Sequence, residues 1–340
     1  MDAVACPDKF RGTLSAAAAA AAMAAGLRRG GIESVVEMPL ADGGEGTLDA
    51  LLAARGGARR TATVTGPLGE PVEAEWGRLP DGTAVVEMAR ASGLELVQGR
   101  KDPLRASSRG TGELIAAAAR AGATRIIVGV GGSACTDGGL AAVEALGWSL
   151  KGLEVLVACD VWTPFLDAAA VYGPQKGASP AQVGLLTRRL EQLAGVYLER
   201  TGVDVRELSG AGAAGGLAGG LAAIGAELEP GFEVVAGAAG LESALEGADL
   251  VVTGEGRLDE TSFVGKTVGG VLEWAAELGV PHRGVIAGQI TDEAREEASV
   301  LGDITLLSLT DRVWQGGETF ARTGLLVEEA AVELAQSVLG

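Results

Sequence analysis

Charged side chains gather in several glycine-rich segments of this 340-residue chain, and each segment follows a short apolar run. The first segment combines the carboxylate of Asp8 with the cations Lys9 and Arg11, directly before an alanine-rich stretch. Two cations beside one carboxylate suit the binding of an anionic group such as a carboxylate or a phosphate. The competing interpretation is a capped helix start with solvated charges.

The second segment places two carboxylates among three glycines. Residues 41–47 read Ala-Asp-Gly-Gly-Glu-Gly-Thr, so Asp42 and Glu45 flank Gly43 and Gly44. A turn needs only one glycine, and each further glycine costs conformational entropy. The repetition therefore indicates that the backbone of this segment approaches a ligand closely.

The third segment is rich in hydroxyls and glycines and follows the clearest predicted strand of the chain, residues 125–130. Glycine-rich turns let backbone N–H groups approach a nucleotide phosphate, and a nearby carboxylate can hold its magnesium ion. Asp137 is the carboxylate of this segment. The residues predicted to contact the nucleotide are Gly131, Gly132, Ser133, Thr136, Gly138 and Gly139.

Two further candidates lie at comparable positions in the middle of the chain. Asp160 directly follows the apolar run 154–159, and Lys176 lies in a Gly-Pro-Gln-Lys-Gly loop. A carboxylate at the end of a buried strand points toward the edge of the sheet where ligands bind in parallel α/β proteins. Asp160 is therefore predicted to be exposed to a ligand.

The last segment, residues 253–257, is followed by a Gly-Lys-Thr tripeptide. This tripeptide is half of a phosphate-binding Walker A motif, but Glu260 stands where the complete motif requires glycine. A true P-loop is therefore not predicted. Gly254, Glu255 and Lys266 remain candidates for nucleotide binding, and Glu255 is also a candidate magnesium ligand.

Two other features suggest chemistry that the sequence does not support well. Residues 210–215 match the dinucleotide fingerprint G-x-G-x-x-G, which would favour an NAD-dependent dehydrogenase. A true fingerprint follows an apolar strand, whereas residues 203–208 are short and polar, so a tight helix-packing element is the preferred interpretation. The single histidine, His282, follows a proline and is expected to be a solvated turn residue without a catalytic role.

The composition makes several classes of function unfavourable. The chain has 27 Lys and Arg against 45 Asp and Glu, a net charge of −18, so nucleic acids and anionic membrane surfaces would repel it. A single histidine excludes a His-rich zinc site. Three widely spaced cysteines predict reduced thiols and a cytoplasmic protein. The alanine-rich residues 16–27 are too few for a membrane span and predict a buried helix.

The elements that must position these segments are strands alternating with helices, which predicts an α/β protein with a largely parallel sheet. Residues 61–88 differ, because they alternate around Gly-Pro and Asp-Gly turns and predict antiparallel strands. A domain boundary is therefore expected near residue 60. The predicted strands of the alternating pattern are residues 35–38, 125–130, 154–159, 249–253, 284–287 and 304–309.

Taken in order, these segments resemble the bacterial glycerate kinase family of type 1, over nearly the whole chain. The resemblance implies a two-domain α/β fold, in which a Rossmann-like or flavodoxin-like parallel-sheet domain carries a second, inserted α/β domain. It also implies phosphorylation of D-glycerate by ATP and Mg²⁺, at the 2-hydroxyl, in organic acid or glyoxylate metabolism. The segments that carry the resemblance are residues 7–13, 41–47, 173–178, 210–216 and 253–257.

Several positions depart from the pattern of this family. The stretch between Trp148 and Glu154 is shorter than usual. The carboxylates and lysines are intact, so the departures bear on the fit of the substrate more than on the type of reaction. The substituted positions are Arg109, Cys135, Thr136, Thr163 and Thr261.

Phosphoryl transfer needs positive charge, precise positioning and a carboxylate that orients the acceptor hydroxyl. Asp160 or Asp42 is expected to orient the hydroxyl of glycerate, and Lys176 is a further catalytic candidate that would bind the glycerate carboxylate or the γ-phosphate. Asp137 or Glu255 is expected to hold magnesium, directly or through water. The residues expected to bind glycerate are Asp8, Lys9, Arg11, Gly43, Gly44, Glu45 and Arg257.

The predicted antiparallel strands of residues 61–88 interrupt the alternation of strands and helices, and in the first domain this alternation returns near Asp249. The predicted domains are therefore a discontinuous one of residues 1–60 and 240–340 and an inserted one of residues 61–239, with the site in the cleft. Two alternative functions remain: a non-catalytic hydroxy-acid sensor with the same fold, and the dehydrogenase. The joint presence of the carboxylates and lysines favours the kinase. The oligomeric state is left open, with a homo-oligomer among the alternatives.

Overall fold

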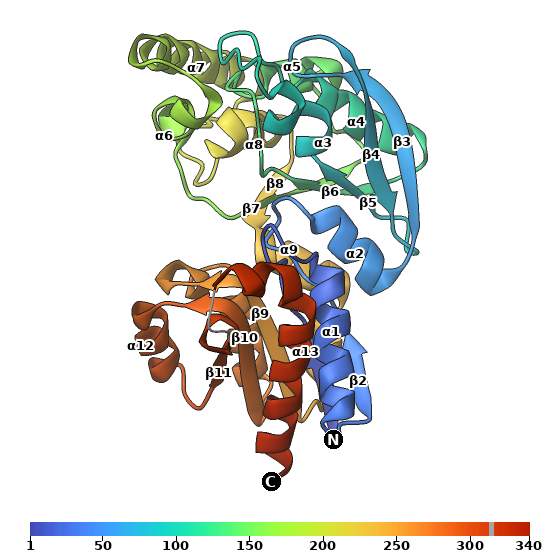
Figure 1. The fold of residues 1–340 in the computed structure, drawn as a ribbon. Coiled ribbons are helices and arrows are strands. Elements are labelled where there is room, and N and C mark those ends of the chain that lie inside the picture. Colours follow the sequence, from blue (N-terminus) through green and yellow to red (C-terminus); the bar gives the residue numbers. More distant parts are fainter. Residues whose placement is uncertain (313–315) are drawn as a thin grey trace. The chain divides into compact units, whose positions relative to one another are not determined.

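The computed structural model describes residues 1–312 and 316–340, and the chain forms two compact units (Figure 1). Each unit has its own sheet and its own hydrophobic core. Unit 1 comprises Met1–Asp42, Asp49–Arg55 and Val235–Gly340. Unit 2 comprises Gly43–Leu48 and Gly56–Val234.

Unit 1 is built on a sheet of five described strands, all parallel, in the order β11-β10-β9-β1-β2. This is the doubly wound order 2-1-3-4-5, in which ligands bind beyond the carboxyl ends of the two strands where the order reverses. In this sheet those two strands are β1 and β9. The strands are β1 (Asp2–Ala5), β2 (Ser34–Glu37), β9 (Leu250–Leu258), β10 (His282–Ile290) and β11 (Thr305–Ser308).

Helices cover both faces of the unit 1 sheet, because successive residues of a strand point to opposite sides. Ile286 of β10 belongs to the core formed with α1 and α13, whereas its neighbours Val285 and Ala287 belong to the core formed with α11 and α12. The helices are α1 (Ala16–Arg29), α10 (Leu241–Leu245), η4 (Glu260–Phe263), α11 (Thr267–Glu277), α12 (Asp292–Val300), η5 (Thr310–Arg312) and α13 (Gly316–Leu339).

Helix α1 is the buried alanine-rich helix that the sequence predicts. Alanine is the strongest helix former, and Ser15 caps the helix because its Oγ accepts a hydrogen bond from the Ala18 N–H at 3.2 Å. The face that includes Met23 and Leu27 is buried. None of the helices in the described part of the chain is long and apolar enough to cross a membrane.

Unit 2 is built on a mixed sheet of six described strands in the order β3-β4-β5-β6-β7-β8. β3, β4 and β5 pair antiparallel, which confirms the prediction for residues 61–88, and β5 to β8 pair parallel. The parallel strands therefore end at one edge of the sheet. The strands are β3 (Ala58–Thr65), β4 (Pro71–Arg78), β5 (Ala84–Glu87), β6 (Arg125–Gly129), β7 (Glu154–Cys159) and β8 (Glu227–Pro230).

The described helices of unit 2 pack on this sheet and on one another. Two further helices, α2 (Thr47–Arg55) and α9 (Gly231–Ala239), have residues in both units. The helices within unit 2 are α3 (Ala89–Ser92), η1 (Leu94–Val97), α4 (Arg109–Arg120), α5 (Leu140–Ala145), η2 (Phe165–Asp167), α6 (Ala168–Tyr172), η3 (Pro174–Lys176), α7 (Pro180–Thr201) and α8 (Ala213–Ala223).

All six strands predicted from the alternating pattern are present, and the differences lie at their ends. β9 extends to Leu258 instead of ending at residue 253. β10 begins at His282, so this exposed histidine is the first residue of a strand and the prediction of a turn position was wrong. The short strand β8 carries two glutamates and a proline and has no apolar run that would reveal it.

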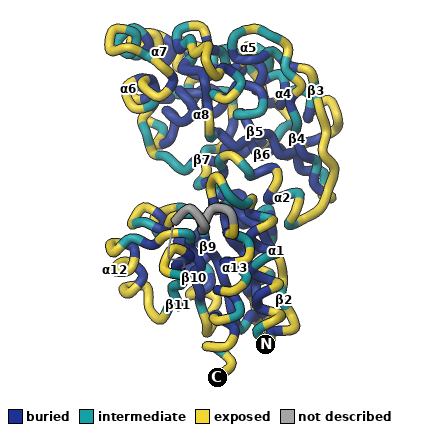
Figure 2. Tube along the Cα trace, viewed as in Figure 1, coloured by how far each residue is buried: buried dark blue, intermediate teal, exposed yellow. Residues whose placement is uncertain are grey.

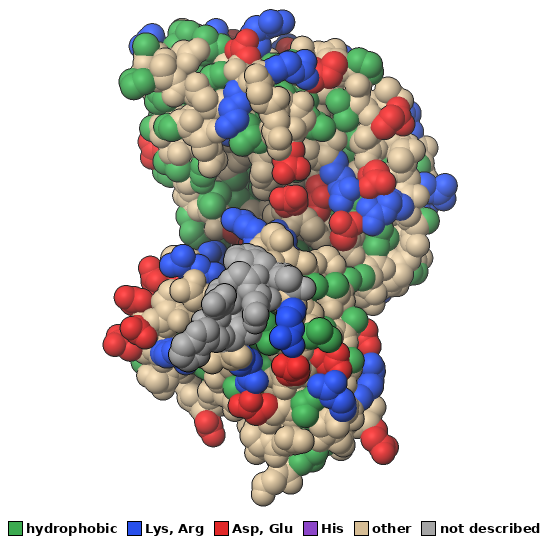
Figure 3. Space-filling model, viewed as in Figure 1, with side chains coloured by type: hydrophobic (Ala, Val, Ile, Leu, Met, Phe, Trp, Pro, Cys, Tyr) green, Lys and Arg blue, Asp and Glu red, His purple; other side chains and the backbone are tan. Residues whose placement is uncertain are grey.

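Burial follows the sheets, and the surface charge is mixed. Buried residues run along the central strands of each unit, whereas exposed residues gather on β3 and α12 (Figure 2). On the face drawn in Figure 3, acidic and basic side chains lie interspersed. The excess of acidic residues is therefore not concentrated into one uniform patch on that face.

Two glycines of α1 let this helix approach α13 closely. A Cβ atom on Gly26 would lie 2.2 Å from the carbonyl oxygen of Glu328, and one on Gly30 would lie 2.5 Å from the Cβ of Ala335. Such contacts are shorter than van der Waals packing allows, so a side chain at either position would push the two helices apart.

We expect Gly26→Ala to destabilise unit 1 by about 1–3 kcal/mol, because the backbone of α13 would have to move. Gly237→Ala is the matched control, since Gly237 is exposed in α9 and its added Cβ would meet no described atom within 4 Å. The control should stabilise the protein by about 0.5–1 kcal/mol. Denaturant unfolding followed by circular dichroism measures both changes, and a Gly26→Ala protein as stable as the control would contradict the packing argument.

Candidate active site

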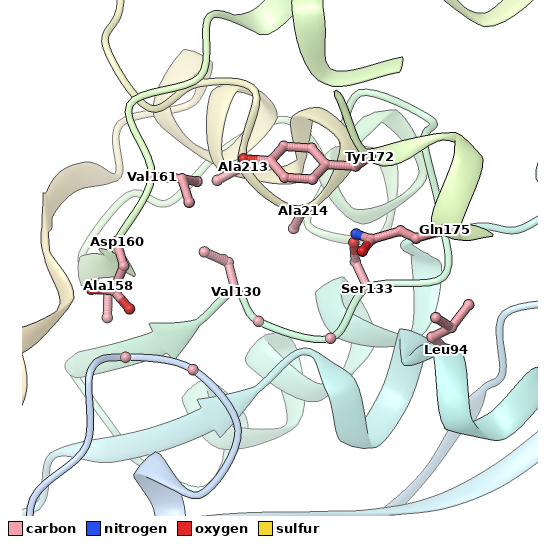
Figure 4. A pocket seen from close by; sticks show the side chains of 14 residues that line it. Leu94, Val130, Ser133, Ala158, Asp160, Val161, Tyr172, Gln175, Ala213 and Ala214 are labelled. Atoms are coloured by element: carbon pink, nitrogen blue, oxygen red, sulfur yellow. The ribbon is translucent and has the colours of Figure 1, made fainter. Parts of the chain in front are cut away.

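Unit 2 holds a pocket of about 280 Å³ beyond the carboxyl ends of β6 and β7 (Figure 4). Of the described residues that line it, Asp160 alone carries a charged side chain. The pocket brings together residues that the sequence predicts for three different roles. They are Asp160 for catalysis, Gly43 and Gly44 for glycerate, and Gly131, Gly132 and Ser133 for the nucleotide.

Asp160 reaches the pocket because of the strand that precedes it. Val155 to Cys159 of β7 are buried in the sheet, and the chain leaves the sheet at Asp160, which is half-buried. The parallel pairing of Gly129 with Ala158 places the ends of β6 and β7 at the same edge. In Figure 4 the side chains of Ser133 and Gln175 point toward one another on the opposite side of the pocket from Asp160.

The loop that contains Gly43 and Gly44 packs directly on the ends of these strands. Gly43 has φ +87°, and a Cβ atom there would lie 2.8 Å from the Cβ of Ala158 and 2.9 Å from the Cα of Gly231. A Cβ atom on Gly131 would lie 2.9 Å from the Cα of Gly44. The sequence predicts that these glycines let a ligand approach closely. The structure shows that they also let the backbone of this loop contact the backbone at the strand ends.

Asp137 occupies a closed hydrogen-bond arrangement. Its carboxylate accepts hydrogen bonds from the N–H and the Oγ of Ser108, both at 2.8 Å, and from the N–H of Gly139 at 3.2 Å. Burial raises the pKa of Asp137, and these hydrogen bonds oppose the rise. The carboxylate therefore ties the glycine-rich loop to the start of α4, a structural task that the sequence does not reveal.

The other predicted nucleotide residues of this loop lie in its packed part. Thr136 is buried, and its Oγ1 has no hydrogen-bond partner among the described residues. A Cβ atom on Gly138 would lie 2.4 Å from the Cδ2 of Leu193 in α7, and one on Gly139 would lie 3.0 Å from the Cα of Leu217 in α8. Gly138 and Gly139 are thus required where the loop meets these helices.

Lys176 is buried in the protein interior, with only 1% of its surface exposed. Its Nζ donates a hydrogen bond to the carbonyl oxygen of Cys135 and lies 6.0 Å from the centre of the Tyr172 ring. Burial lowers the pKa of Lys176 to about 8, while the negative charge of Asp137 favours the protonated amine. Lys176 therefore contacts the backbone of the glycine-rich loop rather than lying on an exposed surface.

Residues 210–216 form the tight packing element that the sequence predicts. Ala214, Gly215 and Gly216 all have left-handed backbone conformations, with φ of 54°, 70° and 90°. A Cβ atom on Gly215 would lie 2.1 Å from the carbonyl oxygen of Cys135 and 2.9 Å from the Nζ of Lys176. Ala214 lines the pocket. The fingerprint-like spacing therefore reflects packing against the pocket wall.

Unit 1 has its own group of carboxylates, at the carboxyl ends of β1 and β9. Asp8 follows β1, and its Oδ2 accepts a hydrogen bond from the Oγ1 of Thr267 at 3.2 Å. Burial and, to a smaller extent, the charge of Asp42 together raise the pKa of Asp8 to about 6. These carboxylates lie at the point where the strand order reverses, the usual ligand position of this architecture.

Glu255 of β9 belongs to the same group. The pKa of Glu255 is raised to about 7: burial is the main cause, Ser262 and Lys266 oppose the rise, and the charge of Asp8 adds to it. Its Oε1 is buried and has no hydrogen-bond partner among the described residues. The structure thus brings Asp8, Asp42, Glu255 and Lys266 together electrostatically.

The remaining predicted residues of unit 1 lie around this group. Lys9 is half-buried, whereas Arg11 and Arg257 are exposed. A Cβ atom on Gly256 would lie 3.0 Å from the backbone nitrogen of Arg11, so these two segments are neighbours. Gly254 is buried in the sheet, where a Cβ atom would lie 1.8 Å from the carbonyl oxygen of Ile286. Gly254 is thus required for strand packing.

Sequence reasoning missed three side chains that shape the pocket region of unit 2. Tyr172 and Gln175 line the pocket, and they flank the glycine and proline of a loop that the sequence did single out. Glu87 is 2% exposed and binds the loop that contains Gly43 and Gly44. The sequence signal that could have identified Glu87 is a charged residue at the end of an apolar strand. Glu45, which the sequence predicts to bind glycerate, is exposed.

Comparison with known proteins identifies the family of the chain. The sequence model described as "Glycerate kinase family" matches residues 3–152 and 148–339. The chain belongs to the glycerate kinase family. The two matches overlap at residues 148–152, within the stretch between Trp148 and Glu154 that is shorter than usual for the family.

The relatives support the same assignment over nearly the whole chain. Glycerate 2-kinase of Escherichia coli (strain K12) is 44% identical, and the match covers 86% of each chain. Glycerate kinase of Bacillus subtilis (strain 168) is 38% identical and covers 99% of this chain and 98% of its own. A crystal structure from Salmonella typhimurium LT2, assigned as glycerate kinase 2, superposes with a TM-score of 0.87 at 35% identity, covering 100% and 98%. The predicted fold class is confirmed.

The raised pKa of Glu255 predicts how the stability of unit 1 depends on pH. Between pH 4.5, the ordinary pKa of this side chain, and about 7, the unfolded chain has lost the proton and the folded chain retains it. The folded state therefore binds more protons, and the free energy of unfolding should fall as the pH rises through this range. Asp8, with its pKa raised to about 6, contributes in the same direction.

We expect Glu255→Gln to reduce this fall in the free energy of unfolding, because glutamine stays neutral at every pH. The variant should then be more stable than the wild type above pH 7 and similar to it at pH 4. Thermal melting between pH 4 and 8 measures the difference. If the melting temperatures of the two proteins changed with pH in parallel, the prediction would be contradicted, because the carboxyl group of Glu255 would then titrate in the folded state as it does in the unfolded chain.

Proposed function

We propose that this protein transfers the γ-phosphoryl group of ATP to the 2-hydroxyl of D-glycerate, giving 2-phosphoglycerate and ADP, in organic acid or glyoxylate metabolism. The family supports a glycerate kinase. The observation that carries the proposal for this chain is the pocket of unit 2, which the carboxylate of Asp160 shares with the glycine pairs Gly43–Gly44 and Gly131–Gly132. A carboxylate can orient the acceptor hydroxyl of a hydroxy acid, and backbone N–H groups can bind a phosphate.

Asp160 is the proposed catalytic carboxylate. It accepts the proton of the 2-hydroxyl as the oxygen of glycerate bonds to the γ-phosphorus, and the bond from that phosphorus to the bridging oxygen of ADP breaks. Gly131, Gly132 and Ser133 are proposed to hold phosphate oxygens through their backbone N–H groups. Gly43 and Gly44 are proposed to contact glycerate from the adjacent wall.

The charged residues of unit 1 are proposed to make ligand contacts of their own. Lys9, Arg11 and Arg257 would bind anionic groups, and Lys266 would bind a phosphate. Thr136, Gly138, Gly139 and Gly254 are buried or packed against their neighbours, which favours a role in shaping the loops that carry the ligand contacts. Lys176 is likewise proposed to shape the glycine-rich loop instead of acting in catalysis, because its amine donates a hydrogen bond to the loop backbone.

Magnesium is the proposed cofactor beside ATP. Among the described residues, no group of three or more His, Cys, Asp or Glu side chains is arranged to hold a metal ion. Mg²⁺ usually takes one or two carboxylates together with phosphate oxygens of the substrate. Glu255 fits such a ligand, because its buried Oε1 lacks a hydrogen-bond donor among the described residues, whereas the carboxylate of Asp137 already accepts three hydrogen bonds. Bound Mg²⁺ would neutralise charge on the phosphates.

Two further proposals concern the chain as a whole. We propose a functional division into residues 1–60 with 240–340 and residues 61–239, which the two compact units support except that residues 43–48 and 56–60 fall in unit 2 and residues 235–239 in unit 1. We propose that the protein works in the cytoplasm, since its three cysteines are free and buried. Its oligomeric state stays open, with a homo-oligomer among the alternatives.

We expect Asp160→Asn to bind ATP normally and to lose about 100-fold or more of its turnover, because a general-base step contributes about 10²–10⁴-fold. The loss should fall on kcat more than on the KM for glycerate, since the carboxylate acts mainly in the transition state. Release of ADP in the presence of D-glycerate measures the rate. Asp167→Asn, an exposed carboxylate in η2, and His282→Gln are controls that should keep the wild-type rate.

An Asp160→Asn protein with near-normal turnover would move the base assignment to Asp42. ADP release that does not depend on glycerate would contradict the proposed substrate. Binding of glycerate without any ADP release would favour the non-catalytic sensor instead.

A further inference from the structure

Glu87 is a buried acidic residue that the proposed mechanism does not use. It is the last residue of β5, and 2% of it is exposed. A carboxylate at such a site is costly unless its charge is compensated by hydrogen bonds or an ion pair. The partners of Glu87 therefore show what the protein gains from this residue.

One carboxylate oxygen of Glu87 caps the start of α2. Its Oε1 accepts hydrogen bonds from the backbone N–H of Gly46 at 2.8 Å and from that of Leu48 at 3.0 Å. The first N–H groups of a helix have no partner within the helix, and a side chain at the cap position usually supplies one. Gly46 stands directly before α2 and has no side chain, so the cap comes from β5 instead.

The second oxygen of Glu87 takes part in an ion-pair network with Arg90 and Glu75. Its Oε2 accepts a hydrogen bond from the Nε of Arg90 at 2.7 Å, and the Nη1 of Arg90 contacts the Oε2 of Glu75 at 2.7 Å. Arg90 thus compensates the buried charge and fixes the direction of the Glu87 side chain. The carboxylate is held from both sides, which suits a rigid anchor.

The segment that Glu87 holds is the one that forms a wall of the pocket. Gly43 and Gly44 line the pocket, only a few residues before the two captured N–H groups. Within the segment, the Oγ1 of Thr47 donates a hydrogen bond to the carbonyl oxygen of Gly44 at 2.8 Å. A displacement at Gly46 would therefore be passed on to Gly44.

We infer that Glu87 is a positioning residue, which fixes the backbone of Gly43 and Gly44 at the pocket wall and thereby sets the fit of glycerate. The inference rests on the proposed function, because it concerns the substrate of the same pocket. Glu87 bonds to the segment but is not among the described residues that line the pocket. Its effect should therefore appear in the KM for glycerate and in the mobility of residues 43–48.

The test compares Glu87→Ala and Glu87→Gln with a matched control, Glu113→Ala. Glu113 makes the same kind of contacts elsewhere in unit 2. The Glu113 carboxylate accepts hydrogen bonds from the N–H of Thr65 at 2.7 Å, from the Oγ1 of Thr65 at 3.1 Å and from the Nε of Arg109 at 2.9 Å. None of these described partners lines the pocket. Hydrogen–deuterium exchange of residues 43–48 and steady-state kinetics with D-glycerate are measured for each protein.

For Glu87→Ala we expect faster exchange at Gly46 and Leu48 and a loss of about 10- to 100-fold in kcat/KM for glycerate, chiefly through a raised KM, since small displacements at a site are costly. Glu87→Gln keeps an oxygen for the two N–H groups but weakens the pairing with Arg90, so its values should lie between those of the wild type and Glu87→Ala. Glu113→Ala should lose stability and keep wild-type kinetics.

Unchanged exchange at residues 43–48 in Glu87→Ala, or kinetics equal to those of Glu113→Ala, would overturn the inference. If Glu87→Ala does not fold, Glu87→Gln decides: a raised KM with faster exchange supports the inference, and wild-type values overturn it. A wild-type protein that releases no ADP with D-glycerate would contradict the proposed function, and exchange at residues 43–48 would then decide alone whether Glu87 holds the loop.

Discussion

Direct contact between backbones at the carboxyl ends of β6 and β7 is the constraint on which the pocket of unit 2 depends. Gly43, Gly129 and Gly131 lie where any side chain would collide with a neighbouring backbone or Cβ atom; a Cβ atom on Gly129, for example, would lie 2.7 Å from the carbonyl oxygen of Gly43. Because these positions lack a Cβ, a loop can lie directly on the strand ends. Part of the pocket wall is consequently backbone, and polar recognition there falls on N–H groups, on Asp160 and on the side chains of Ser133, Tyr172 and Gln175.

Buried charges hold this arrangement in place. The carboxylate of Asp137 joins the glycine-rich loop to α4, Lys176 bonds to the carbonyl of Cys135, and Glu87 caps the start of α2. Each of these ions satisfies backbone groups that the glycine-rich loops leave without side-chain partners. In a chain with so many glycines, these contacts supply the rigidity that phosphoryl transfer requires of its site.

Much of the fold was predictable from the sequence, because hydrophobic runs, glycine positions and turn residues report local structure. The strands from 125–130 and 154–159 and the antiparallel hairpins follow from such patterns, and so does the position of Asp160 at the end of β7. The short strand β8 was not predictable, because its charged residues carry no apolar periodicity. Strand order also depends on contacts between distant segments, which a single sequence does not contain.

The roles of individual side chains were harder to predict than their proximity to the site. Lys176 and Asp137 have residue types suited to phosphate and magnesium, yet both bond to the protein's own backbone. The sequence places Glu87 only within a predicted strand, although its carboxylate holds a pocket loop. Sequence spacing identifies which loops meet at a sheet edge, whereas the direction of each side chain depends on tertiary packing.

Proton-coupled phosphorus NMR of the product formed from ATP, Mg²⁺ and D-glycerate tests the central claim most directly. Carbon 2 of glycerate carries one hydrogen and carbon 3 carries two, so the splitting of the phosphorus signal identifies the phosphorylated oxygen. The account predicts a glycerate-dependent doublet that grows as ATP is consumed. A triplet would place the phosphoryl group on the 3-hydroxyl, and the absence of any new phosphate ester would contradict the assignment of the pocket to glycerate phosphorylation.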